Sequence, residues 1–176
     1  MPIEQVRMVT TQGEAEKAQA FLIRPLEQAD QWVRCLLIER WGSTMVVTRG
    51  QVHAADELPG FAALRGSKPV GLVTYRVRDG ETEVVSLDSL LERQGIGSAL
   101  LHAVRAAAVA AGCRRMWLIT TNDNLAAIRF YQKRGFRLVA IHRDALELSR
   151  RLKPQIPLIG LDGIPLRDEI ELELLL

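Results

Sequence analysis

The stretch ERQGIGSALL, residues 92–101, decides the fold, because it places a glycine-containing turn directly before a long helix. The helix continues through HAVRAAAVAAG, and an extended apolar segment precedes the turn. Backbone N–H groups in the first turn of a helix lack intrahelical acceptors and attract anions. Gly95 and Gly97 let the backbone approach a ligand closely, since no Cβ intervenes. The stretch therefore predicts either a cradle for a polyphosphate cofactor or an ordinary tight turn from strand to helix.

Length and composition indicate one globular domain. A chain of 176 residues can bury a sizeable core but is short for two domains. Residues 1–19 are polar and weakly patterned, so we expect a loosely ordered leader followed by a single domain over 20–176. No apolar run approaches the roughly 20 residues of a membrane span, and the N-terminus lacks the apolar core of a signal peptide. We expect a cytoplasmic protein without a membrane partner.

Charge, cysteine and histidine usage exclude several other classes of protein. The formal net charge is only +2, because arginine-rich patches are balanced by an acidic C-terminal strand. This distribution differs from the basic stripe of a nucleic-acid-binding protein. Cys35 and Cys113 are isolated thiols, which we interpret as small core residues rather than a disulfide or redox pair. The three histidines have no ligand-like spacing, so no metal is expected.

Turn signals divide the chain into short strands and amphipathic helices. A hairpin is expected over 61–78, with its turn at Gly66-Ser67-Lys68-Pro69. The cluster Asn122-Asp123-Asn124 predicts the start of a helix that Gly135 closes. Further strands are expected over 21–25, 45–48, 82–87, 115–120, 136–141 and 169–176, and helices over 31–41, 96–111, 125–134 and 144–152.

The C-terminal strand alternates three apolar residues with Glu169, Glu171 and Glu173. This period of two is typical of a strand with one face in water. If the strand lay at the border of a sheet, its open edge would favour pairing with a second copy of the chain. We therefore expect a homodimer formed through this strand.

Two motifs resemble those of the GNAT superfamily of N-acetyltransferases. Residues 92–97 match both glycines of the pyrophosphate signature [QR]-x-x-G-x-[GA], with Glu92 where glutamine or arginine is usual. The second motif, N-x-x-A-x-x-x-Y-x-x-x-G-F, is matched at every position: Asn124, Ala127, Tyr131, Gly135 and Phe136. The resemblance covers residues 70–141 and extends by element order over 20–176. A dinucleotide fold or a P-loop fits worse, because neither a third glycine nor G-K-[ST] follows.

The resemblance implies an α/β (α+β) fold with a mixed, mostly antiparallel sheet of about six to seven strands flanked by helices. It further implies binding of acetyl-CoA between the strands TEVVSL and MWLIT, without a metal. Acetyl transfer to a small amine or peptide amine would then proceed by direct attack in a ternary complex. The acceptor pocket of this family comes from variable segments, here 41–58 and 153–165, so the sequence does not identify the acceptor. A non-catalytic acyl-CoA-binding or regulatory module is the alternative.

The resemblance also assigns catalytic roles. Tyr131 would protonate the departing thiolate, since a phenol with a pKa of about 10 is protonated at neutral pH. Glu83 would act as general base through water, because an alkylamine with a pKa near 10.4 is almost wholly protonated at pH 7. The alternatives are a core tyrosine beside Phe130 and a solvated carboxylate at a strand edge. Glu81 and Asp88 are substitutes for the base.

The cofactor contacts follow from the same resemblance. Backbone groups of residues 87–89 would pair with the pantetheine arm, and a main-chain N–H there would hold the oxyanion. Asn124 would bond an amide of the arm, and Arg93 would supply charge that Glu92 does not. Lys133 or Arg134 would meet the adenosine 3′-phosphate or face solvent. The full predicted set is Leu87, Asp88, Ser89, Arg93, Gln94, Gly95, Ile96, Gly97, Ser98, Asn124, Tyr131 and Arg134.

Overall fold

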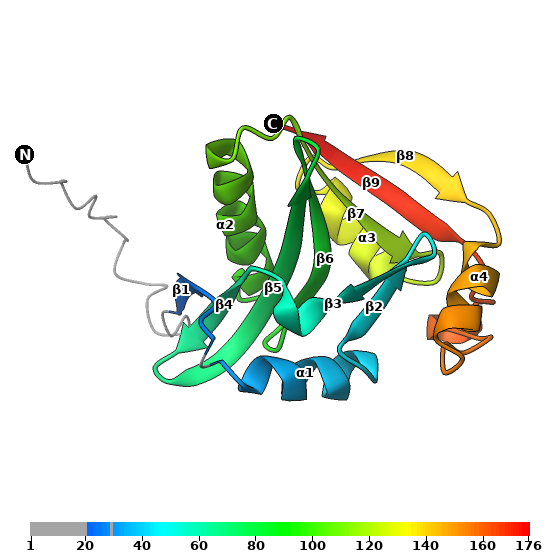
Figure 1. The fold of residues 1–176 in the computed structure, drawn as a ribbon, viewed down its shortest axis with the longest axis horizontal. Coiled ribbons are helices and arrows are strands. Elements are labelled where there is room, and N and C mark those ends of the chain that lie inside the picture. The colour runs from blue at the N-terminus through cyan, green and yellow to red at the C-terminus, as the bar shows by residue number, and fades with distance from the viewer. Residues whose placement is uncertain (1–20, 29) are drawn as a thin grey trace, which may run out of the picture.

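The structure is a computed structural model that describes residues 21–28 and 30–176, so the leader expected over 1–19 lies outside the described residues. The described chain builds a seven-stranded sheet and a separate two-stranded hairpin (Figure 1). The hairpin pairs β2 (Met45–Thr48) with β3 (Gln51–Ala54). In spatial order, the strands of the sheet are β1 (Leu22–Pro25), β4 (Gly60–Arg65), β5 (Lys68–Arg78), β6 (Glu81–Ser89), β7 (Arg115–Thr121), β9 (Glu169–Leu175) and β8 (Arg137–His142).

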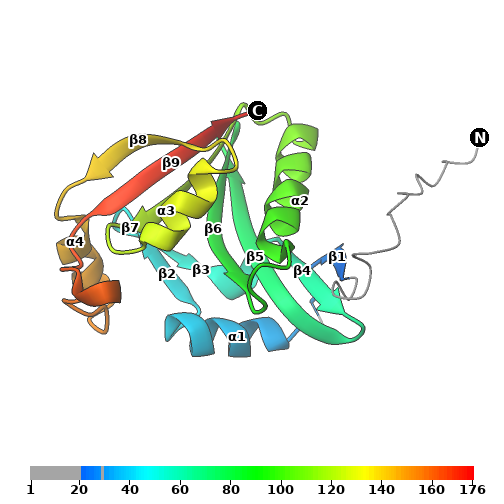
Figure 2. The same ribbon diagram turned by 180° about the vertical axis from the view of Figure 1, so that it is seen from behind.

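Helices cover both faces of this sheet. On one face, α2 (Ile96–Ala110) and α3 (Leu125–Gln132) pack over the larger apolar core (Figure 2). On the other face, α1 (Trp32–Trp41) and the β2–β3 hairpin pack over a smaller one. The remaining helical segments are α4 (Ala145–Leu152) and the short 3₁₀ turns η1 (Ala55–Glu57) and η2 (Leu161–Gly163). Of the helices in residues 21–28 and 30–176, none is long and apolar enough to cross a membrane.

The sheet is mixed and mostly antiparallel, which confirms the expected fold class. All its neighbouring strands run antiparallel except β6 and β7. The middle of β5 is buried from both sides, since Leu72 packs with the α1 core and Val73 with the α2 core. The hairpin β2–β3 lies inside segment 41–58, where the sequence predicted only the first strand.

The parallel strands β6 and β7 separate halfway along their length. They pair only where residues 81–84 lie opposite residues 115–118. Just beyond, the register between β6 and β5 shifts: Val84 lies opposite Tyr75 but Ser86 opposite Thr74, so Val85 is the extra residue of a β-bulge. From there β6 continues along β5 while β7 continues along β9, and the two strands diverge (Figure 1). The facing edge of β6 beyond Val84 therefore has no strand partner in β7.

The glycine turn seats α2 at the end of β6. Gly95 adopts a left-handed conformation with φ of 77° immediately before the helix, which glycine accommodates without strain. Across the sheet, Gly71 on β5 provides space for the helix. A Cβ at Gly71 would lie 2.6 Å from Cγ2 of Ile96 and 3.0 Å from the carbonyl oxygen of Asp88. The first turn of α2 is thus fixed against the strand that ends just before it.

The predicted water-exposed face of β9 is wrong. This strand pairs with β7 on one edge and β8 on the other, so it is an inner strand. Glu169 and Glu171 on the supposed wet face are only 1% and 6% exposed, because the β2–β3 hairpin and α4 contribute partners to them. The open C-terminal edge on which the expected homodimer rested does not exist, since the border strands are β1 and β8.

Replacing Gly71 with alanine should destabilise the fold by about 1 to 3 kcal/mol, the usual cost of overpacking a core. The new Cβ would collide with Ile96 and crowd the β6 backbone. Urea unfolding measures the change. In an Ile96→Ala background, which removes the nearest colliding atom, the added cost of Gly71→Ala should shrink. Equal midpoints for Gly71→Ala and the parent chain would contradict this packing.

Candidate functional site

A cleft of about 460 Å³ opens between the end of β6, the glycine turn and α3. We call it the β6–α3 cleft. Its walls include most of the residues that the sequence predicted to contact a cofactor. The predicted residues that line it are Leu87, Ser89, Arg93, Gly95, Ile96, Gly97, Ser98, Tyr131 and Arg134, and Glu92, Ala126, Ala127 and Phe130 complete the lining.

The first turn of α2 presents free N–H donors to this cleft. The first bond inside the helix runs from the N–H of Ala99 to the carbonyl oxygen of Gly95, at 3.0 Å. Throughout the part of the chain that the structure describes, the N–H groups of residues 96–98 have no protein acceptor. These donors and the helix dipole together suit an anion such as a phosphate.

Phe130 and Arg134 hold α3 against this turn. A Cβ at Gly97 would lie 3.0 Å from Cζ of Phe130, so the glycine permits close contact between the two helices. The guanidinium of Arg134 lies 3.5 Å from the centroid of the Phe130 ring, and its Nε donates a 2.9 Å hydrogen bond to Oγ of Ser98. A cation is thereby fixed beside the free N–H groups of α2.

Glu92, which departs from the usual signature, is exposed and lines the same cleft. Among residues 21–28 and 30–176, its carboxylate forms no ion pair. No contact therefore fixes its side chain among the N–H donors. The nearby Arg93 is also exposed, with a left-handed backbone at φ of 59°.

Tyr131 lines the β6–α3 cleft. Its ring packs edge-on against Phe130 and Phe136, with centroids 5.1 and 5.5 Å away, and the residue is 8% exposed. Burial raises the pKa of this phenol, and the negative charge of Asp88 raises it further. Among the described residues the hydroxyl has no hydrogen-bond partner. Tyr131 is thus a protonated group whose hydroxyl proton is not used by another described residue.

The side chains of Asp88 and Gln94 are engaged elsewhere. Oδ2 of Asp88 accepts a 2.7 Å hydrogen bond from the indole N–H of Trp41, which ties α1 to β6. Burial raises the pKa of Asp88, while its bonds to Trp41 and Arg40 oppose that shift. The side chain of Gln94 accepts a hydrogen bond from Arg65. A cofactor contact at Asp88 would therefore come from the backbone, whereas the amide nitrogen of Gln94 remains a donor.

A second cavity, of about 500 Å³, lies in the opening between β6 and β7, and we call it the β6–β7 cavity. Val85 and Asn124 line it, whereas Leu87 and Ala127, slightly later on the same elements, line the β6–α3 cleft. Neighbouring residues of β6 and of the start of α3 thus line the two hollows. Oδ1 of Asn124 caps α3 through the N–H of Ala127, at 3.1 Å, which leaves its amide nitrogen as a donor.

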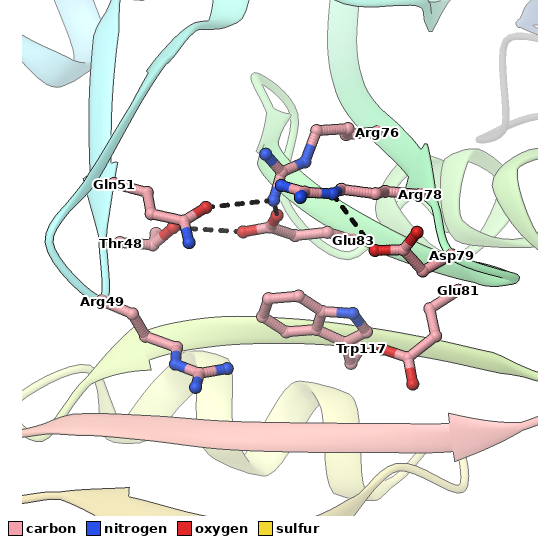
Figure 3. A pocket seen from close by; sticks show the side chains of 9 residues that line it. All are labelled: Thr48, Arg49, Gln51, Arg76, Arg78, Asp79, Glu81, Glu83 and Trp117. Atoms are coloured by element: carbon pink, nitrogen blue, oxygen red, sulfur yellow. Dashed lines mark hydrogen bonds and ion pairs between the residues drawn. The ribbon is translucent and has the colours of Figure 1, made fainter.

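Glu83 is buried, so the alternative interpretation of this residue as a solvated carboxylate at a strand edge is wrong. Its Oε2 accepts a 2.7 Å hydrogen bond from Arg76, and its Oε1 accepts a 3.1 Å bond from Thr48 (Figure 3). Nε2 of His53 lies 3.7 Å from Oε1. Together with Trp117, the residues Thr48, Arg76 and Glu83 line a separate hollow of about 280 Å³. Thr48 also lines the β6–β7 cavity and so joins Glu83 to it. The substitute base Glu81 pairs with Arg115 at 3.3 Å.

Glu169 lines the β6–β7 cavity and was missed by sequence reasoning. Oε2 accepts a 2.8 Å hydrogen bond from the backbone N–H of Arg49, and Oε1 a 3.2 Å bond from Ser149. Burial raises the pKa of this carboxyl above its ordinary value. No cationic side chain among the described residues pairs with it within ion-pair distance. A strand in which glutamate alternates with apolar residues has the same sequence pattern whether the glutamates face water or a cavity. The sequence therefore could not indicate that Glu169 faces a cavity.

Comparison with known proteins places these features in a family. Residues 26–136 match the model of the Acetyltransferase (GNAT) family. The chain is 46% identical over 133 residues to the uncharacterised protein YdhI of Bacillus subtilis (strain 168). The aligned residues make up 75% of this chain and 83% of that protein.

Two solved structures share the fold. The IAA acetyltransferase from Bacillus cereus ATCC 14579 aligns with a TM-score of 0.69 and 23% identity, over 89% of this chain and 100% of that chain. A GNAT family acetyltransferase from Elizabethkingia anophelis, solved with acetyl-CoA bound, gives a TM-score of 0.67 and 20% identity, over 89% of this chain and 98% of that chain.

Replacing Arg76 with methionine should destabilise the protein by roughly 3 to 5 kcal/mol, because it leaves the buried carboxylate of Glu83 without its cation. The matched control is Arg78→Met. Because Arg78 and its partner Asp79 are both exposed, this substitution should change the free energy of unfolding by no more than about 0.5 kcal/mol. Chemical unfolding of both variants compares them. Equal losses of stability would show that the Glu83–Arg76 pair has no special role.

Both tyrosines of the chain should resist ionisation in the native state. Burial raises the pKa of Tyr75 and of Tyr131, so the native protein should stay largely un-ionised near pH 10, where the unfolded chain is about half-ionised. Because the folded-state pKa values are the higher ones, their stabilisation is complete below about pH 10 and is lost as the pH rises through them. Ultraviolet titration of Tyr75→Phe isolates Tyr131. Native half-ionisation near pH 10 would contradict the structure.

Proposed function

Because the chain belongs to the Acetyltransferase (GNAT) family, we propose that it transfers an acetyl group from acetyl-CoA to a primary amine by direct attack in a ternary complex. The observation that supports this most is the composition of the β6–α3 cleft. Three features line this one cleft: the free N–H donors of α2, the buried and protonated Tyr131, and the edge of β6 that has no partner in β7. The acetyl-CoA bound in the Elizabethkingia anophelis structure, which shares this fold, supports the same cofactor.

The cofactor would use the cleft along its length. The pyrophosphate would bind the N–H groups of residues 96–98, with Arg93 and Arg134 supplying positive charge. The pantetheine arm would lie along residues 87–89 as an added strand, where β6 has no partner in β7. The thioester would then point toward the β6–β7 cavity, which would receive the acceptor.

The proposed reaction needs a neutral amine, an oxyanion donor and an acid. The amine nitrogen attacks the thioester carbonyl carbon, and the resulting oxyanion accepts a hydrogen bond from the N–H of Leu87 or Asp88. The carbon–sulfur bond then breaks, and Tyr131 gives its proton to the thiolate. Glu83, joined to the cavity through Thr48, would take the amine proton by way of water.

A test begins with acetyl-CoA binding, followed by thiol release and mass spectrometry of products over a panel of amines, peptides and polyamines. Binding with acetylation of at least one amine supports the proposal. Calorimetry that detects no binding at near-millimolar acetyl-CoA would overturn it. Binding without any acetylated product would favour a non-catalytic module.

Tyr131→Phe should lower kcat by about 10²- to 10⁴-fold, because the acid that protonates the thiolate is lost. The affinity for acetyl-CoA should change little, since the aromatic ring and its packing remain. Steady-state kinetics and calorimetry separate the two effects. The matched control is Tyr75→Phe, which should retain activity, because Tyr75 is only partly buried and lines neither hollow. Equal kcat for both variants would remove Tyr131 from the mechanism.

A further inference from the structure

We infer that the acceptor is a monoamine with an apolar substituent, and that Glu169 receives its ammonium end in the β6–β7 cavity. This inference rests on the proposed acetyl transfer and names its substrate class. It is drawn from the chemistry of the cavity walls.

Glu169 is a buried carboxylate that lacks a cation of its own. It is 1% exposed, and the two groups that bond it, the N–H of Arg49 and the hydroxyl of Ser149, are both neutral. Two nearby basic side chains, Arg49 and His142, pair instead with Glu171, at 3.6 and 2.8 Å. Burying a carboxylate without a positive partner is costly. A ligand that brings an ammonium group would supply that partner. Before its nitrogen attacks the thioester, this ammonium would lose one proton by way of water to Glu83, the base of the proposed reaction.

The remaining walls of the cavity are mostly apolar. Val47 comes from the β2–β3 hairpin, Val85 from the bulge in β6, Ile119 from β7, Leu146 from α4, and Ile156 and Pro157 from the following loop. At about 500 Å³, the space suits a small ligand with several carbon atoms. A hydrocarbon chain or ring beside the amine would bury its apolar surface against these walls, which favours binding.

The cavity also disfavours a second positive charge. Lys153 lines it, and its Nζ donates 3.0 Å hydrogen bonds to the carbonyl oxygens of Trp41 and Met45. This ammonium brings a like charge into the cavity wall. A second ammonium on the acceptor would meet either Lys153 or the apolar walls, with Glu169 already occupied. A diamine should therefore be a poorer acceptor than a monoamine of equal length.

The experiment compares hexylamine with its diamine counterpart, hexamethylenediamine, as acceptors. The parent enzyme should acetylate hexylamine with at least a 10-fold higher kcat/KM. Glu169→Gln should raise KM for hexylamine about 10- to 100-fold, the range for losing a hydrogen bond to a charged group. The matched control is Glu173→Gln, on the same strand but outside the cavity and paired with Arg115, and it should leave KM unchanged. Equal use of both amines, or equal KM in both variants, would overturn the inference.

Two further measurements keep the inference separable from the proposed function. Calorimetry of hexylamine binding to the CoA-loaded protein needs no turnover. Binding that Glu169→Gln weakens about 10- to 100-fold supports the site. Absent binding, or binding that the substitution leaves unchanged, overturns it. If acetylation occurs but prefers polyamines, the proposed function stands and the inference fails. Should Glu169→Gln not fold, Ile156→Ser in the loop tests the apolar wall. It should reduce the advantage of hexylamine over ethylamine by several-fold, and an unchanged advantage would count against the inference.

Discussion

The pairing of β6 with β5, interrupted by one extra residue at Val85, determines the rest of the site. Because β6 stays hydrogen-bonded to β5 along its length, the bulge and the twist that follows it carry the strand away from β7. The opening between β6 and β7, the free edge of residues 87–89 and the position of α2 all follow from that divergence. The helix begins a few residues after β6 ends, so its donors line the β6–α3 cleft, while Asn124 lines the β6–β7 cavity.

The part of the site that the sequence predicted is the part that local backbone chemistry fixes. Gly95 has a positive φ, Asn124 caps α3, and Tyr131 follows at fixed helical spacing, so each could be placed from its neighbours along the chain. Most strands and helices were predicted for the same reason. The bulge at Val85 and the inner position of β9 depend instead on partners distant in sequence. The burial of Glu169 therefore could not be predicted, and the homodimer expected from an open C-terminal edge lost its basis.

Four buried carboxylates on the α1 and hairpin side of the structure have different partners, and this difference defines the chemistry available there. Glu83 has Arg76, and Glu171 has Arg115 and His142. Asp88 accepts the indole N–H of Trp41, with Arg40 at 3.4 Å. Glu169 has only neutral donors. The first three are satisfied within the protein, whereas the fourth has unused capacity for a positive ligand.

The same bulge gives the sheet a mechanical property. Strands β1, β4, β5 and β6 form one half, strands β7, β9 and β8 the other, and the halves are joined by only four residue pairs between β6 and β7. In the free protein the two halves of the sheet are therefore hydrogen-bonded to each other at one end and separated at the other. A ligand whose amides bond to the free edge of β6 would take the place of a missing strand between the halves. Binding of such a ligand would restrict the motion of one half relative to the other, and slower exchange of the β6 amide hydrogens would measure this effect.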